Sequence, residues 1–104
     1  MLPRSGVLTF LFTDVVGSTQ RWDRARDAMR VALDRHDVIV ADAVAEHGGH
    51  VVKKTGDGFM AVFEDPADGV AAAVAAQRGF GEAAWPEVEG GLASRMGVHA
   101  GPAE

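Results

Sequence analysis

The stretch Val7–Thr13 constrains the fold more than any other part of the sequence. It is apolar at almost every position and carries Phe10, Leu11 and Phe12 in a row. A strand that is apolar on both faces is normally buried in the middle of its sheet, and this one is far too short to cross a bilayer. We therefore expect Val7–Thr13 to be an inner strand around which the rest of the chain is arranged.

The remaining sequence predicts two helices and three more strands. In chain order these are a helix over residues 26–47, strands at His50–Thr55 and Gly58–Glu64, a helix that starts at Asp65-Pro66, and a strand at Ser94–His99. Apolar residues that repeat every three and four positions indicate the first helix, which Gly48-Gly49 ends. A short separate helix is expected before it, over residues 17–24. The inner side of the second main helix is expected to be Val70, Ala73, Val74 and Gln77.

The element order is β-α-β-β-α-β, which is typical of an α+β fold with a ferredoxin-like sheet and helices on one face. Right-handed crossovers make the first two strands parallel and insert the third between them. The end of the first strand and the hairpin at Gly56-Asp57 then lie at the same edge of the sheet. Asp14 closes that strand, so Asp14 and Asp57 are expected to be neighbours in space.

Composition limits the functions to consider. With 104 residues and 47% hydrophobic content the chain can form one small core, and its net charge of −5 gives no basis for binding nucleic acid or an anionic membrane. The sequence has no cysteine, which excludes thiolate metal sites and a thiol nucleophile. We expect one cytoplasmic domain over residues 1–104 that binds neither nucleic acid nor membrane.

Two converging carboxylates without cysteine suit a hard cation such as Mg²⁺ or Mn²⁺. Val15–Thr19 follows Asp14 as a small-residue entry to a helix, whose amides suit phosphate oxygens. Together these features predict metal-assisted phosphoryl or nucleotidyl transfer. Each part has a simpler explanation, because Asp14 can cap a helix and Asp57-Gly58 is ordinary hairpin composition. Gly17 and Ser18 can be turn residues, and one of two adjacent strand lysines normally faces solvent.

Three motifs resemble class III adenylate and guanylate cyclases. The segment Phe12–Thr19 resembles their first metal motif, and Val51–Ala61 resembles the second, which runs from a lysine to an aspartate. Arg95–Gly101 resembles the Arg-x-Gly-x-His-x-Gly strand that follows. The resemblance covers essentially the whole chain, in order, and is closest in style to actinobacterial cyclase domains.

The resemblance implies a role for several residues. Asp14 and Asp57, with the Val15 carbonyl, would bind two Mg²⁺ or Mn²⁺ ions, and the amides of Val16, Gly17, Ser18 and Thr19 would face the phosphates. Lys53 matches the lysine that contacts adenine, so ATP is the expected substrate, with 3′,5′-cyclic AMP and pyrophosphate as products. In this family the sites form in a head-to-tail homodimer, so Lys53 would serve the site whose metals lie on the partner.

The family pattern continues beyond what residues 1–104 contain. A second base contact, a ribose-orienting asparagine and a transition-state arginine have no counterpart here, and Pro102 stands where some members have arginine. We therefore expect an incomplete, inactive cyclase domain. One alternative is a non-catalytic cyclase-homology module for dimerisation or nucleotide sensing in a signalling or transcriptional regulator. Another is a diguanylate cyclase. The hairpin argues against it, because Thr55–Phe59 reads Thr-Gly-Asp-Gly-Phe, whereas that class has Gly-Gly-Asp/Glu-Glu-Phe.

Overall fold

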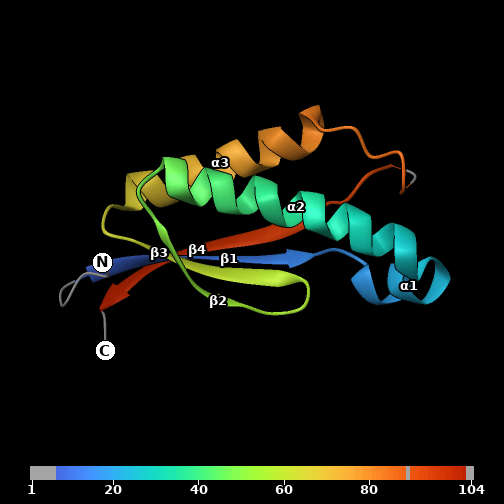
Figure 1. Cartoon of the computed structure of the whole chain (residues 1–104). Coiled ribbons are helices and arrows are strands. Elements are labelled where there is room, and N and C mark those ends of the chain that lie inside the picture. Colours follow the sequence, from blue (N-terminus) through green and yellow to red (C-terminus); the bar gives the residue numbers. More distant parts are fainter. Residues whose placement is uncertain (1–6, 89, 103–104) are drawn as a thin grey trace.

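The computed structural model describes residues 7–88 and 90–102. Its elements are β1 (Val7–Val15), α1 (Ser18–Arg24), α2 (Arg26–Glu46), β2 (His50–Lys54), β3 (Gly58–Phe63), α3 (Pro66–Glu82) and β4 (Ser94–Pro102). The strands form one sheet in the order β2-β3-β1-β4, and α2 and α3 lie together over one of its faces (Figure 1). The α+β fold predicted from the element order is therefore confirmed. Within the described ranges, no helix combines the length and apolarity needed to span a bilayer.

β1 lies inside the sheet, as its apolar sequence predicts. It is antiparallel to β3 on one side and to β4 on the other. Since β3 is also antiparallel to β2, β1 and β2 run parallel with β3 between them. The C-terminal end of β1 and the connection between β2 and β3 consequently lie at the same end of the sheet (Figure 1).

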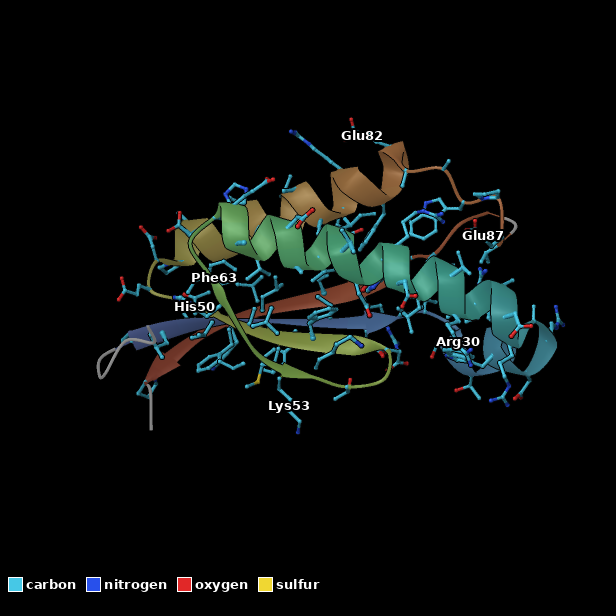
Figure 2. All side chains as sticks on the ribbon, viewed as in Figure 1. Arg30, His50, Lys53, Phe63, Glu82 and Glu87 are labelled. Atoms are coloured by element: carbon cyan, nitrogen blue, oxygen red, sulfur yellow. The ribbon has the colours of Figure 1, made fainter. Side chains whose placement is uncertain are left out.

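The two faces of the sheet have different surroundings. We call the face under α2 and α3 the covered face and the other the open face. Leu11 belongs to the core that the helices complete, and alternation along a strand places Phe10, Phe12 and Asp14 on the open face. Figure 2 shows this division, with Phe63 between the sheet and the helices and Lys53 on the opposite side.

Close packing between the covered face and the helices forms the main core. Leu11, Ala61 and Phe63 from the sheet are at most 1% exposed. The helix residues packed in the same cluster are Val40, Ala43, Val44, Ala72, Ala76 and Phe80. The three- and four-residue repeat predicted for α2 is thus its buried stripe, and that stripe also includes the fully buried His36.

The inner side predicted for α3 is wrong at three of its four residues, because Ala73 packs against the main core whereas Val70, Val74 and Gln77 are exposed. The buried residues of the helix are Gly69, Ala72, Ala76 and Phe80, whereas Val70 and Val74 are 51% and 45% exposed. In an alanine-rich helix the apolar residues surround the axis, so periodicity alone does not select a face. The start of the helix is as predicted, with Asp65 accepting a hydrogen bond from the Ala67 amide at 2.9 Å.

A half-buried ion pair fixes the loop between α3 and β4 to the helix layer. Arg35 donates to both carboxylate oxygens of Glu87 and lies over the Trp85 ring, 5.6 Å from its centroid. The Arg35 guanidinium holds the pKa of the Glu87 carboxyl below its ordinary value. The Trp85 indole N–H donates to the Phe80 carbonyl at 2.9 Å. The loop is therefore held by directional contacts to both α2 and α3.

Candidate functional site

Asp14 is the penultimate residue of β1 and lies on the open face. It is opposite Gly58 of β3 and Arg95 of β4 in the strand registers, so it has a strand on each side. Its side chain is 49% exposed. The helix that follows begins with Gly17 as its N-cap, and no side chain caps it. Asp14 is therefore not the cap of that helix, and the simpler explanation of this residue does not hold.

Asp57 lies in the short connection between β2 and β3, beside the end of β1. The Val15 amide donates to the Asp57 carbonyl at 3.1 Å, which fixes the connection to β1. Gly58 lies so close to β1 that a Cβ on it would collide with the backbone oxygen of Thr13. The Thr13 hydroxyl in turn accepts a hydrogen bond from the Phe59 amide at 3.0 Å. These contacts bring the two aspartates together at one end of the sheet, as the element order predicts.

Each aspartate has a side-chain partner within the chain. The Ser18 hydroxyl donates to Asp57 Oδ2 at 2.6 Å, and Ser18 is itself buried. Arg95 Nη2 donates to Asp14 Oδ2 at 2.6 Å from the neighbouring strand. Neither contact is predicted by the sequence motifs, in which Ser18 contributes its amide and Arg95 is part of the Arg-x-Gly-x-His-x-Gly strand. The register of β4 against β1 is the signal that identifies Arg95.

The segment between β1 and α1 makes a sharp turn beside the aspartates. Gly17 adopts a left-handed conformation, with φ 68° and ψ 24°, which glycine tolerates at no steric cost. The Val16 amide already donates to the Ala93 carbonyl at 2.9 Å. The amides of Ser18 and Thr19, by contrast, precede the first hydrogen bond within α1, which runs from Arg21 N to Gly17 O. Of the residues predicted to face phosphates, Val16 is thus the one whose amide is engaged.

The adjacent lysines of β2 point to opposite faces. Lys53 pairs with Met60 in the register and is exposed on the open face, as Figure 2 shows. Lys54 instead contacts the helix layer, with its ammonium 3.1 Å from Asp37 and 5.5 Å from the centre of the Phe59 ring. Lys54 is therefore a structural residue, and Lys53 remains available on the same face as Asp14.

The carboxylates at this end of the sheet suit Mg²⁺ or Mn²⁺ when waters or phosphates supply the remaining ligands. Across residues 7–88 and 90–102, no group of three or more histidine, aspartate or glutamate side chains is close enough to hold a metal ion. Mg²⁺ usually keeps several waters and binds through one or two carboxylates plus substrate phosphates. Asp14 and Asp57 supply those two carboxylates, and waters or substrate phosphates can complete the coordination.

A cavity of about 470 Å³ is lined in part by the same turn. Its lining includes Val16, Gly17, Arg21, Arg24 and Glu87, and neither aspartate. The Asp14 side chain is 49% exposed, so this carboxylate lies at an open surface. A substrate at Asp14 and Asp57 would need a second surface to enclose it.

Comparison with known proteins agrees with this arrangement. The model of the adenylate and guanylate cyclase catalytic domain matches residues 2–103. The chain is 34% identical over 117 aligned residues to an adenylate cyclase of Lachancea kluyveri, an alignment that covers 95% of this chain and 6% of the relative. A solved structure of an adenylate cyclase from Trypanosoma brucei superposes with a TM-score of 0.86 at 25% identity, over 92% of this chain and 57% of that one. The guanylyl cyclase Cya2 has the same fold, with a TM-score of 0.84 at 22% identity over 98% and 57% of the two chains.

The fold and the site thus define an α+β domain of the nucleotide cyclase type. The chain belongs to the adenylate and guanylate cyclase catalytic domain family. It spans 57% of each of the two solved structures and a small fraction of the fungal relative.

Proposed function

We propose that this chain provides the metal half of an adenylate cyclase site, which converts ATP to 3′,5′-cyclic AMP and pyrophosphate in a complete domain. The observation that carries the proposal is that Asp14 and Asp57, which match the two metal motifs of the family, lie together at one end of the sheet. Metal-assisted nucleotidyl transfer requires two such carboxylates beside the triphosphate.

Asp14, Asp57 and the Val15 carbonyl would hold two Mg²⁺ or Mn²⁺ ions, which supply Lewis-acid activation of the ribose 3′-hydroxyl and neutralise charge on the phosphates. The amides of Gly17, Ser18 and Thr19 orient the phosphate oxygens. The Ser18 hydroxyl keeps the Asp57 carboxylate in place through its hydrogen bond. These residues position the reacting groups without forming a covalent intermediate.

Lys53 gives the proposed preference for ATP. Its exposed position on the open face supports a role toward a second subunit, because that face carries no helix in the described residues. In the complete domain, Lys53→Glu is expected to lower the use of ATP by about 1–3 kcal/mol in transition-state free energy, since a carboxylate cannot donate to adenine. The relative kcat/KM for ATP and GTP measures this effect. An unchanged preference would mean that Lys53 is only a surface lysine.

The open face also supports the proposed head-to-tail homodimer. Phe10 and Phe12 stack there with ring centroids 6.4 Å apart, and Phe12 is 45% exposed. Exposed aromatic residues beside polar ones are typical of protein interfaces. Dimerisation through this face would bring a partner's Lys53 toward Asp14 and Asp57 and would enclose the substrate.

Metal binding tests the proposal directly. In the chain of residues 1–104, Asp14→Asn and Asp57→Asn are each expected to weaken Mn²⁺ binding at least about tenfold, because loss even of groups that only support ligands commonly costs 10–100-fold. Electron paramagnetic resonance of free Mn²⁺ measures the affinity. Asp42→Asn, on the exposed side of α2, is the matched control. Equal Mn²⁺ affinity in all three variants would refute the metal site.

We further propose that residues 1–104 alone yield no measurable cyclic AMP. They contain no counterpart of the second base contact, the ribose asparagine or the transition-state arginine of the family pattern. Loss of one preorganised donor commonly costs about 10²–10³ in rate, and several together leave almost nothing. Cyclic AMP formed from Mn²⁺-ATP is the measurement, with a version that contains those motifs for comparison. Nucleotide binding without turnover in that longer version would favour the non-catalytic module.

A further inference from the structure

The two aspartates of the candidate metal site are held by different kinds of partner. Asp57 accepts from the buried, neutral hydroxyl of Ser18. Asp14 instead pairs with the cationic guanidinium of Arg95, directly opposite it on β4. A neutral hydroxyl can remain bonded to a carboxylate that also binds a cation, whereas a guanidinium and a metal ion repel each other at the same carboxylate. Ser18 is therefore compatible with a metal ion at Asp57, whereas the charge of Arg95 repels a metal ion at Asp14.

The contact between Arg95 and Asp14 is short and lies at the surface. Nη2 of Arg95 is 2.6 Å from Oδ2 of Asp14, a distance typical of a charge-assisted hydrogen bond. The Arg95 side chain is 73% exposed, so it has room to leave the carboxylate without disturbing the core. The guanidinium thus occupies an oxygen that a metal ion would use, through a contact that can be broken at small cost.

We propose that Arg95 is an internal counter-cation that neutralises Asp14 in the metal-free chain and competes with the divalent ion for its carboxylate. It thereby sets how much free metal the site requires. The inference rests on the metal site proposed above and adds to it a residue that opposes metal binding. If Arg95 were only a cross-strand partner that stabilises the sheet, its replacement would change stability and leave metal affinity unaltered.

The test compares Mn²⁺ binding by three versions of residues 1–104, namely the wild type, Arg95→Gln and Arg95→Lys. Mn²⁺ alone is the probe, with free Mn²⁺ followed by electron paramagnetic resonance and the site located by broadening of the Gly56–Phe59 amide resonances. Arg95→Gln is expected to bind Mn²⁺ about three- to tenfold more tightly, since an exposed ion pair and one nearby charge are removed. The gain should shrink in 0.5 M salt, because surface charges are screened. Arg95→Lys, which keeps the charge, should retain most of the wild-type affinity.

Arg78→Gln is the matched control, because it removes the same charge from the exposed side of α3, on the helix side of the sheet. It is expected to leave Mn²⁺ affinity within about twofold of wild type. Equal or weaker Mn²⁺ binding by Arg95→Gln, in a chain whose wild type binds Mn²⁺ at these amides, would overturn the role of Arg95. Failure of both the wild type and Arg95→Gln to bind Mn²⁺ would instead overturn the metal site itself. Circular dichroism and the melting temperature confirm that each variant is folded.

Discussion

The covered and open faces of the sheet differ in what their residues do, although one strand supplies both. On the covered face Leu11 is 1% exposed and belongs to the core cluster that residues of both helices complete. On the open face the next residue, Phe12, is 45% exposed, and Asp14 after it carries the candidate site. Alternate residues of β1 therefore stabilise the fold and present the chemistry. Substitutions on the two faces should separate stability from function.

The largest effect is expected on the covered face, at Phe63. Its side chain is 1% exposed in the main core, so Phe63→Ala should lower the free energy of unfolding by about 3–5 kcal/mol through lost burial and a residual cavity. Chemical denaturation followed by circular dichroism measures it. Phe63→Leu, which keeps most of the volume, provides a folded variant with a smaller loss, under about 1.5 kcal/mol. Losses of equal size for both would show that cavity formation is not the cause.

A smaller effect is expected at Ser18, which joins the turn after β1 to the candidate site. Ser18→Ala removes the donor to Asp57 Oδ2 and should lower the free energy of unfolding by about 1–2 kcal/mol, since hydrogen bonds to charged groups are the stronger ones. Its exposed neighbour offers the control, because Thr19→Ala removes a hydroxyl of similar size. If the two variants were equally stable, the contact between Ser18 and Asp57 would contribute nothing in solution.

The ion pair in the helix layer predicts a pH dependence. Arg35 lowers the pKa of Glu87, so the folded state binds this proton less readily than the unfolded state. The stabilisation is present above the ordinary glutamate pKa and disappears as the pH falls through the lower folded pKa. Glu87→Gln should therefore reduce the melting temperature at pH 7, and the difference from wild type should close in acid. Glu82→Gln, at the exposed end of α3, should show no such convergence (Figure 2).

The smallest effect on stability is expected on the open face. Phe12→Gln should change the free energy of unfolding by no more than about 0.5 kcal/mol, because the side chain is half exposed. It should nevertheless weaken self-association, which sedimentation velocity over a range of concentrations measures. A loss of stability near that of Phe63→Ala would remove the distinction between the faces. Unchanged association would show that Phe12 is not part of an interface.

Much of the architecture could be predicted because strong local signals agree with one another. The apolar run of β1 and the stripe of α2 each permit one arrangement, and together with crossover handedness they place Asp14 beside Asp57. The buried side of α3 could not be predicted, since its alanines fit on any side. What selects the side is tertiary: Phe80 stacks on the His36 ring with centroids 4.8 Å apart. That contact depends on how the two helices meet.

The partners of the site residues were harder to predict for a different reason. The contact between Arg95 and Asp14 depends on a strand register, and Ser18 reaches Asp57 only after a left-handed turn at Gly17. Local propensity predicts neither of these two contacts. The hairpin, by contrast, was predicted correctly at Gly56 and Asp57, because two adjacent turn residues between two strand-forming segments leave little choice.

The strict alternation of β1 also limits how this domain can change during evolution. Insertion or deletion of one residue between Leu11 and Asp14 would place both on the same face, and so either turn the carboxylate into the hydrophobic interior or expose the leucine, unless it broke the pairing with both neighbours. Substitution is therefore open to this strand but a change of length is not. Divergence in length should accumulate in the loop between α3 and β4, where an added residue leaves the parity of the sheet intact.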